Sequence, residues 1–367
     1  MDTKPKIIAN YLPQYHRIPE NDKWWGEGFT DWISVKNAVP LFENHVQPKV
    51  PKDGNYYSLD NAETIRWQAD LARSYGVYGF GIYHYWFNSQ LHLLEKPAEI
   101  LLDNKDIDIH YLFLWDNCTW KRTWSNIKRA NDWAPKFDSD DVTSESGILA
   151  ELKYGDEKDW KIHFDYLLPF FKDERYIKID NKPLFAFFQS RNDFKTICAM
   201  TDYWDTLAKK AGFSGIICMM RDNCFHMGRN YKIRYTPFIP VTKLSFIQNR
   251  IMNYLAEKKH AIRFRSYDNC WNEILRDAKK ADSKTFLSGF VGFDDTPRRG
   301  NKGRIITDAT PEKFEHYLKE LIDISQKQNK EYVFITAWNE WGEGAYLEPD
   351  EQNGFAYLEA LKKAVEE

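Results

Sequence analysis

Val333-Phe334-Ile335-Thr336-Ala337-Trp338-Asn339-Glu340-Trp341-Gly342-Glu343-Gly344 is the stretch that organises this chain. It begins with the apolar, β-branched and aromatic residues that are typical of a buried strand. It ends in two carboxylates, an amide and two indoles, with glycines that permit a sharp turn. A strand that leads directly into acidic and aromatic side chains is typical of the edge of an active site.

Similar apolar runs of strand length recur along the chain, and helical patterns follow most of them. Strands are predicted at 6–11, 77–83, 110–114, 183–188, 216–220, near 235–241, and at 286–291 and 332–337. Helices are predicted at about 61–75, 93–103, 158–171, 193–211, 268–280, 311–327 and 353–366, with a basic helix after the strand near 235–241. About eight strand–helix units without a composition break predict one α/β domain over 1–367, a (β/α)8 TIM-type barrel. A doubly wound parallel sheet is the weaker alternative.

Two segments interrupt this alternation, near 12–58 and 116–157. Both lack clear helical or strand periodicity over most of their length, and the aromatic residues of the first argue against disorder. We expect them to be loop insertions over the C-terminal face of the barrel, where the active site of this fold lies.

The aromatic content is unusually high, at 16% of the chain with 14 Trp, 21 Tyr and 24 Phe. A large aromatic core accounts for about half of these residues in our interpretation. Trp is seldom fully buried because its N–H needs a partner. The doublet Trp24-Trp25, and Trp120 with Trp124 in a polar stretch, therefore predict a surface for flat ligands. A sugar ring, with one apolar face and hydroxyls around its edge, fits such a surface.

Charge and composition exclude several classes of protein. The formal net charge of −3 predicts no preference for nucleic acid or for anionic membranes. No apolar run is long enough for a transmembrane segment, and the N-terminus has no signal-peptide pattern. An odd number of cysteines without a CxxC pair favours a reducing compartment, so a cytoplasmic protein is expected. These cysteines are Cys118, Cys198, Cys218, Cys224 and Cys270.

Neither a metal site nor a cofactor site is predicted. No group of His, Cys or carboxylate residues has metal-ligand spacing. No glycine-rich phosphate-binding motif is present either. The expected partner is an oligosaccharide or polysaccharide substrate.

Glu340 and Glu343 are the candidate catalytic residues. Two carboxylates near one bond can divide the work, since one donates a proton while the other stays ionised, and cleavage of a glycosidic bond usually needs this division. The alternative is that both are loop acids paired with arginines. Their position after a buried strand, beside Trp338 and Trp341, gives the two interpretations equal weight.

Candidate substrate-binding residues lie at the ends of other predicted strands. His84 and Tyr85 follow the second strand, where a structural histidine is the alternative. Asp294 lies in a charged segment with Asp295, Arg298 and Arg299, which is either a surface ion-pair cluster or a site for an acceptor sugar or phosphate. Asn339 either binds a hydroxyl or satisfies the turn. The remaining candidates, several of which we expect to be structural, are Tyr11, Gln14, Trp24, Trp25, Trp115, Asn117, Trp120, Arg221 and Trp341.

Residues 337–350, Ala-Trp-Asn-Glu-Trp-Gly-Glu-Gly-Ala-Tyr-Leu-Glu-Pro-Asp, resemble the C-terminal signature of the WbsX family. Its members are described as glycosyltransferases of bacterial surface-polysaccharide synthesis. The blocks at 11–16, 25–32, 83–87 and 295–300 also look like blocks of that family, so the resemblance covers nearly the whole chain. It implies a glycosyltransferase of O-antigen or capsule-type biosynthesis.

The WbsX family is similar in turn to the endo-α-mannosidases, (β/α)8 enzymes with an equivalent W-N-E-W-x-E-G loop. The resemblance implies that Glu340 assists attack by the 2-hydroxyl of the sugar through an epoxide-like intermediate. It also implies that Glu343 is the general acid/base and that Tyr11 lies beside the reacting sugar. Because no carboxylate attacks directly, the separation of the two acids would not be diagnostic in the usual way. The block at 115–124 departs from the family, since Cys118 stands where an acid is usual, and this leaves substrate specificity open.

The sequence thus predicts an enzyme that acts on an α-linked, mannose-like glycosyl unit of a bacterial surface glycan, as a glycosyltransferase. A glycoside hydrolase or transglycosylase is the alternative, because an acid pair of this kind also serves hydrolysis. A non-catalytic glycan-binding barrel is the second alternative, since a fold does not imply a function. The sugar, the linkage, the acceptor and the oligomeric state stay open.

Overall fold

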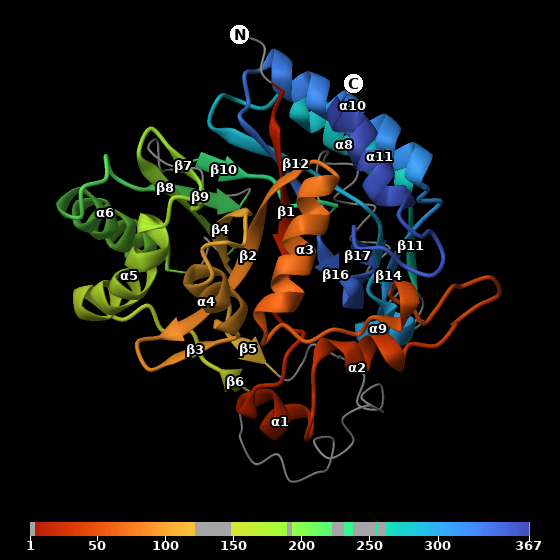
Figure 1. Ribbon diagram of the computed structural model, residues 1–367, viewed down its shortest axis with the longest axis horizontal. Coiled ribbons are helices and arrows are strands. Elements are labelled where there is room, and N and C mark those ends of the chain that lie inside the picture. The colour runs from red at the N-terminus through yellow and green to blue at the C-terminus, as the bar shows by residue number, and fades with distance from the viewer. Residues whose placement is uncertain are drawn as a thin grey trace.

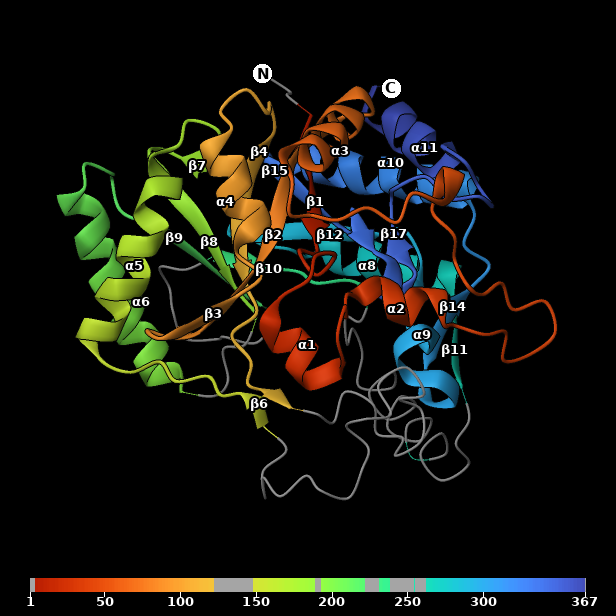
Figure 2. The same ribbon diagram turned by 60° about the horizontal axis from the view of Figure 1, so that its bottom comes forward.

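Eight parallel strands close into a barrel in the computed structural model, which describes residues 4–121, 148–188, 193–221, 231–237, 254 and 262–366 (Figures 1 and 2). Around the barrel the strands are β1 (Lys6–Tyr11), β2 (Val77–Asn88), β4 (His110–Trp115), β8 (Lys182–Phe187), β9 (Ile217–Arg221), β10 (Tyr231–Ile233), β12 (Thr285–Phe290) and β15 (Tyr332–Thr336). The barrel is closed because β1 pairs in parallel with both β2 and β15. The predicted (β/α)8 fold class is confirmed.

Helices surround the barrel (Figure 1). They are α3 (Ala62–Ser74), α4 (Lys96–Asp103), α5 (Glu157–Lys172), α6 (Phe194–Lys210), α8 (Tyr267–Ala278), α10 (Pro311–Lys327) and α11 (Ala356–Glu366). Capping side chains determine where several of them begin. Asn61 accepts a hydrogen bond from the Thr64 N–H, and Thr310 accepts one from the Lys313 N–H. The predicted helices that fall within the described part of the chain are present within a few residues of their expected bounds.

The sixth strand differs from the prediction. It lies at Tyr231–Ile233, where it pairs with β9 and β12, rather than near 235–241. The predicted run contains Pro237 and Pro240, which have no N–H to donate to a neighbouring strand. Its residues 238–241, and the basic helix predicted behind it, lie outside the described part of the chain.

The segment 12–58 is also more regular than predicted. It contains the short helices α1 (Pro19–Trp25) and α2 (Asp31–Lys36), of seven and six residues. Helices this short do not complete two turns, so they leave no readable periodicity in the sequence. Of the second predicted insertion, 116–157, residues 122–147 lie outside the described part.

Smaller elements lie around the barrel. A three-stranded sheet consists of β11 (Arg263–Ser266), β14 (Arg304–Thr307) and β13 (Phe293–Asp294), and the short helix α9 (Thr296–Arg299) follows β13. After β15, the two-residue strands β16 (Asn339–Glu340) and β17 (Ala345–Tyr346) pair in antiparallel fashion. The remaining short strands are β3 (Leu91–Leu93), β5 (Trp120–Lys121), β6 (Ile148–Ala150) and β7 (Lys178–Ile179).

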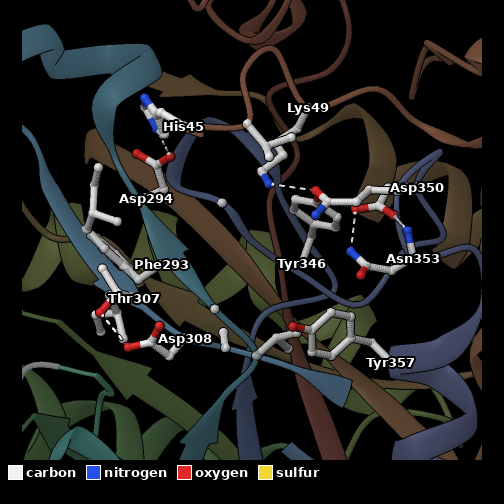
Figure 3. A pocket seen from close by; sticks show the side chains of 18 of the residues that line it. His45, Lys49, Phe293, Asp294, Thr307, Asp308, Tyr346, Asp350, Asn353 and Tyr357 are labelled. Carbon is white, nitrogen blue, oxygen red and sulfur yellow. Dashed lines mark hydrogen bonds and ion pairs between the residues drawn. The ribbon is translucent and has the colours of Figure 1, made fainter. Parts of the chain in front are cut away.

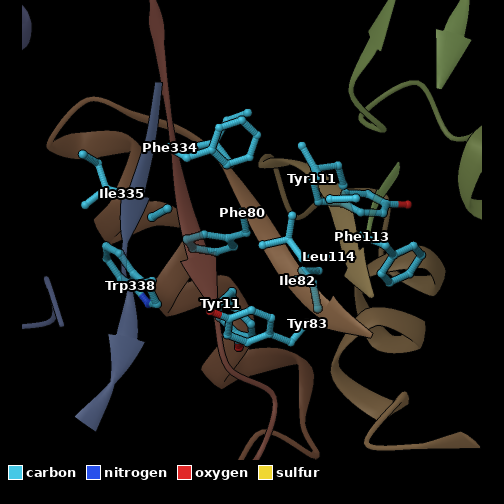
Figure 4. Close-up of a cluster of buried hydrophobic side chains, with 14 of the residues drawn as sticks. Tyr11, Phe80, Ile82, Tyr83, Tyr111, Phe113, Leu114, Phe334, Ile335 and Trp338 are labelled. Atoms are coloured by element: carbon cyan, nitrogen blue, oxygen red, sulfur yellow. The ribbon is translucent and has the colours of Figure 1, made fainter. Parts of the chain in front are cut away.

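Aromatic side chains make up much of the core (Figure 4). The ring of Phe80 lies 4.9 Å from that of Tyr11 and 5.4 Å from that of Trp338. Several indoles are fully buried, and the N–H groups of three of them find partners: Trp115 donates to the Trp86 carbonyl at 2.8 Å, Trp204 to the Trp160 carbonyl at 2.8 Å and Trp341 to Glu348 at 2.7 Å. Buried tryptophans thus absorb more of the aromatic surplus than the sequence predicted.

The described helices include none that is both long enough and apolar enough to cross a membrane.

Candidate active site

Glu340 and Glu343 lie on the loop that follows β15, within the β16–β17 hairpin. Two glycines make this loop possible. A Cβ on Gly342 would come within 2.6 Å of the Arg298 Nε and 2.7 Å of an Asp31 carboxylate oxygen. Gly344 adopts φ +58°, a backbone conformation that residues with a side chain rarely adopt. The glycines therefore let a buried guanidinium approach the loop.

Arg298 binds both glutamates. Its Nη1 donates to Oε1 of Glu340 and to Oε1 of Glu343, each at 3.1 Å. Its Nη2 donates to Oδ2 of Asp31 at 2.8 Å. The guanidinium is a fixed fork of donors, so it holds the three carboxylates in a defined arrangement. Three separate segments, α2, α9 and the loop after β15, meet at this point.

The two acids thus do pair with an arginine, as the alternative interpretation expected. The Arg298 side chain is only 14% exposed, so this is not a surface ion pair. One cation here faces three carboxyl groups, so ionisation of all three would leave an excess of negative charge in a buried place. Such an excess is typical of sites where protons are exchanged rather than of structural pairs.

Tyr15 and Asn339 hold the loop against the end of β1. The Tyr15 hydroxyl donates to the Asn339 carbonyl at 2.8 Å and accepts from the Trp341 N–H at 3.1 Å. The Asn339 side chain accepts from the Leu12 N–H at 2.7 Å and donates to the Leu12 carbonyl at 3.0 Å. Asn339 therefore satisfies the backbone, as the structural alternative predicted, and positions its neighbour Glu340.

Glu340 is the more buried of the two acids, with 5% of its side chain exposed against 22% for Glu343. Burial raises the pKa of Glu340 to about 8, the Arg298 guanidinium opposes this rise, and the charges of Glu343 and Asp31 add to it. Glu340 Oε2 has no hydrogen-bond partner within the described part of the chain. A buried carboxyl oxygen without a partner is costly, so this atom is available to a ligand hydroxyl.

Three tyrosines from two strand ends surround the acid pair. Tyr83 and Tyr85 come from β2, and Tyr235 follows β10. Burial is the largest cause of the raised pKa of each, and the charge of Glu340 adds to it at all three. The Tyr83 and Tyr235 hydroxyls lie 2.8 Å apart. The acids thus lie at the carboxyl ends of the strands among hydroxyl-bearing rings.

Several predicted substrate-binding residues lie around Tyr85 and Tyr235. Gln14 Nε2 donates to the Tyr85 hydroxyl at 3.1 Å. The Trp120 ring lies 5.0 Å from that of Tyr85 and 6.1 Å from that of Trp24. The Arg221 guanidinium lies 4.8 Å from the centre of the Tyr235 ring. The structure therefore brings Gln14, Trp24, Tyr85, Trp120 and Arg221 together on the side of the acid pair.

His84 and Trp115 point away from this site. Successive side chains of a strand alternate between its two faces, so His84 lies opposite Tyr83 and Tyr85. Its Nε2 lies 2.8 Å from Nε2 of His163 on α5, and burial lowers the pKa of His84 to about 3. Trp115 also packs outward, with its ring 4.8 Å from that of His163. Both residues belong to the packing between barrel and helices.

Trp341 contacts a different carboxylate, Glu348, and Tyr11 is linked to the same carboxylate through Gln68. The Trp341 Nε1 donates to Glu348 at 2.7 Å. The Tyr11 hydroxyl donates to Gln68 at 2.6 Å, and Gln68 donates to Glu348 at 2.7 Å. Burial raises the pKa of Glu348 to about 7. These side chains surround Glu348, and the Tyr11 hydroxyl bonds to Gln68 rather than to Glu340 or Glu343.

The remaining candidates lie elsewhere. Asn117 donates to the Tyr154 hydroxyl at 2.7 Å. The ring of Trp25 lies 6.0 Å from that of Phe29. The carboxylate of Asp294 accepts from His45 and Gln47, at 2.8 and 2.7 Å, on the outer side of the loop.

Some residues of the site were not among the predicted site residues. They are Tyr15, Asp31, Tyr83, Tyr235 and Arg298. Alternation with Tyr85 could have identified Tyr83, and the charged segment 294–299 already contained Arg298. Nothing in the sequence links Asp31 to Arg298, which lies 267 positions away.

No cluster of three or more His, Cys, Asp or Glu side chains suited to a metal ion occurs among the residues that the structure describes. The groups that the structure brings together are three carboxyl groups, a guanidinium and phenol hydroxyls. Such groups can donate and accept protons and can bind sugar hydroxyls.

Comparison with known proteins adds a family and a fold. The family model described as "Glycosyltransferase WbsX" matches residues 7–361. A curated relative from Xanthomonas campestris pv. campestris, named "Uncharacterized protein WxcX", is 29% identical over an alignment of 375 positions, which covers 98% of this chain and 49% of the relative. The chain thus spans about half the length of the curated relatives it matches.

Solved structures with the same fold have low sequence identity. One is the GH99 endo-alpha-mannosidase from Bacteroides thetaiotaomicron, with a TM-score of 0.55 at 14% identity, covering 98% of this chain and 96% of that one. Another is a "Glycoside hydrolase-like protein" with a TM-score of 0.55 at 12% identity, covering 98% and 94%. At such identities the likeness shows the fold alone.

Proposed function

The chain belongs to the WbsX glycosyltransferase family, and from this premise we propose that Glu340 and Glu343 act on an α-linked, mannose-like glycosyl unit of a bacterial surface polysaccharide. The observation that carries the proposal is the pair of glutamates on one loop, bound to one guanidinium at the carboxyl end of the barrel. The unpartnered Glu340 oxygen and the surrounding tyrosines support a ligand rich in hydroxyls.

The two acids have different tasks in the proposed reaction. Glu340 takes the proton of the sugar 2-hydroxyl, whose oxygen attacks the anomeric carbon as the glycosidic C–O bond breaks. Glu343 gives its proton to the leaving oxygen. Water or an acceptor hydroxyl then opens the strained ring at the anomeric carbon and gives its proton to Glu343, and Glu340 returns its proton to the 2-oxygen. Both carboxyls end in the states in which they began.

The surroundings of the pair support this division of work. A 2-hydroxyl is a very weak acid, so its base needs a high proton affinity, and burial gives Glu340 a pKa of about 8. Glu343 is more exposed, as a group that meets both the leaving group and the incoming acceptor should be. Arg298 keeps the two acids in place during both steps and compensates part of their charge.

A glycoside hydrolase or transglycosylase is the second candidate. The buried acid pair favours it, because proton transfer to a leaving oxygen is the central step of glycoside hydrolysis. The two candidates differ only in the molecule that opens the intermediate and in the donor that enters the site.

Product analysis separates the candidates. The protein is incubated with nucleotide sugars and an acceptor glycan, and separately with α-linked mannose oligosaccharides. Elongation that needs a nucleotide sugar supports the transferase. New reducing ends without a nucleotide sugar would reject it in favour of the hydrolase. Sugar binding without turnover, unchanged in Glu340→Gln and Glu343→Gln, would reject both in favour of a glycan-binding barrel.

A further inference from the structure

A cavity of about 320 Å³ is lined by Gly344 and Tyr346, which follow Glu343 in the chain, and Figure 3 shows Tyr346 among its side chains. Three parts of the chain enclose it: the segment 42–49, the small sheet of β13 and β14, and the segment 344–357. Gly344 and Asp294 both line the cavity and pack closely against each other, since a Cβ on Gly344 would lie 3.0 Å from Asp294. Cavities of this size accommodate small organic ligands.

The polar groups of the cavity are fixed in place. The Asp350 carboxylate accepts from the Tyr346 hydroxyl at 2.7 Å and from the Asn353 side chain at 3.1 Å. The Lys49 ammonium donates to the Gln352 side chain at 3.2 Å. Burial lowers the pKa of Lys49, while the charges of Asp350 and Asp294 oppose this shift. The Lys49 ammonium therefore lies close enough to both carboxylates to interact with them electrostatically. Donors and acceptors therefore alternate around the cavity.

The charge of the lining selects against anions. The described lining carries the carboxylates Asp294, Asp308 and Asp350 but only one ammonium, that of Lys49. His45 adds no positive charge in this geometry: its Nδ1 accepts from the Leu41 N–H at 3.1 Å, so its proton is on Nε2 and is donated to Asp294. Phosphate groups and uronic acids would meet a net negative lining.

Aromatic rings supply the apolar part of the same lining. They belong to Phe42, Phe293, Tyr346 and Tyr357. Rings beside carboxylates and a lysine suit a neutral ligand with one apolar face and several hydroxyls, because hydroxyls both donate to carboxylates and accept from ammonium groups. A sugar in its neutral form has this chemistry.

We propose that this cavity is a second carbohydrate-binding site, which takes a neutral sugar unit of the glycan. The choice of a sugar over another neutral polyol rests on the proposed function. The site lies against the catalytic loop: the ring of Tyr346, which lines the cavity, stacks on that of Trp341 at 3.7 Å. A glycan held here stays close to the acid pair, which raises its effective concentration there.

Binding of methyl α-D-mannopyranoside, followed by saturation-transfer NMR titration, tests the proposal. The titration uses a Glu340→Gln, Glu343→Gln variant, so that it measures binding without turnover. Two further substitutions in this background change the cavity: Tyr357→Ala removes a lining ring, and Ala309→Trp fills the space. The matched control is Phe355→Ala, because Phe355 stacks on Tyr75 at 6.1 Å and does not line the cavity.

The acid-pair site is expected to bind the probe as well, so the parent should show two binding constants. We expect each cavity variant to weaken one of the two at least about tenfold, which corresponds to about 1.4 kcal/mol, while Phe355→Ala keeps both constants of the parent. We also expect glucuronate to bind more weakly than the neutral probe. Unchanged affinity in a folded cavity variant would overturn the proposal, and so would preference for glucuronate. If Ala309→Trp does not fold, Tyr357→Ala decides alone. Loss of binding in these variants, combined with absence of turnover in the wild type, would retain the second site and reject the proposed function.

Discussion

Arg298 is the residue on which the geometry of the acid pair depends, because one guanidinium contacts Glu340, Glu343 and Asp31. Replacing it with the apolar, similarly sized methionine leaves three buried carboxylates without a cation. Removal of one partner from a buried ion pair typically costs about 3–5 kcal/mol. We therefore expect Arg298→Met to lower the free energy of unfolding in urea by an amount of this order and to abolish turnover.

The neighbouring Arg299 is the control for this substitution. It pairs with Asp295 at 3.1 Å, and 39% of its side chain is exposed. Asp295 is itself buried, but it keeps the Arg304 guanidinium at 2.8 Å when Arg299 is replaced, so Arg299→Met should cost clearly less than Arg298→Met. Equal losses of stability in the two variants would mean that the three carboxylates do not depend on Arg298.

The pH dependence of turnover reports the role of Glu340. Burial raises the pKa of its carboxyl group to about 8, so most of it is protonated at neutral pH. If Glu340 is the base, the ionised form of its carboxyl group is the active one. The acid step is removed by using Glu343→Gln with a substrate whose leaving group needs no proton, and there kcat/KM must rise as the pH increases toward about 8. A value of kcat/KM that falls through this range would instead assign the proton-donating role to Glu340.

The same group makes the stability of the protein depend on pH. Its pKa is raised from 4.5 in the unfolded chain to about 8 in the folded protein, so its stabilising contribution is complete below pH 4.5 and is lost as the pH rises through about 8. Glu340→Gln has no proton to lose. The unfolding free energy of the wild type should therefore fall between pH 5 and pH 9 by at least about 1 kcal/mol more than that of the variant. Parallel pH curves from urea unfolding would refute the buried-carboxyl account.

At the scale of elements, the two faces of β2 separate function from packing. Tyr83 and Tyr85 face the acid pair, whereas His84 faces α5 and contacts His163. Burial lowers the pKa of both histidines, so both stay neutral in the folded protein at neutral pH. Their contribution to stability is present above pH 6.5, the value in the unfolded chain, and is lost as the pH falls below it.

Replacing both histidines with phenylalanine removes this acid sensitivity. We expect the double variant His84→Phe, His163→Phe to lose less thermal stability than the wild type between pH 6.5 and pH 4. In the wild type these imidazoles take up protons only when the chain unfolds, which favours the unfolded state at low pH, and the variant has no such groups. The exposed His316 is the control position, and His316→Gln should follow the wild-type curve. A double variant as acid-sensitive as the wild type would show that other groups determine the transition.

At the scale of the whole molecule, the barrel could be predicted from the sequence because the patterns that specify its strands and helices are local. Apolar runs and capping residues lie within a few positions of the elements that they specify, as Asn61 does for α3. The sixth strand was misplaced because apolar content was weighed without the two prolines in 235–241. Strand β10, which pairs with β9 and with β12, has only three residues, and a run this short leaves no clear strand pattern in the sequence.

The site was less predictable because it is built from contacts between distant segments. The catalytic candidates were readable from their own loop, but Asp31 and Arg298 meet only after the barrel has closed. Both faces of β2 carry aromatic residues, so the sequence alone could not tell which of His84 and Tyr85 faces the site. Asn339 and Trp341 stand beside the acids in the sequence yet bond to the backbone and to Glu348.

The most direct test of the account compares kcat/KM for the wild type, Glu340→Gln and Glu343→Gln, with whichever glycan substrate the wild type turns over. Glu359→Gln, on the exposed side of α11, is the control for the loss of one carboxyl group. Loss of a proton-transferring group typically costs about 100- to 10,000-fold, so each site variant should fall by at least about a hundredfold while the control stays near the wild-type value. Near-normal turnover in either folded site variant would contradict the central claim that this acid pair performs the chemistry.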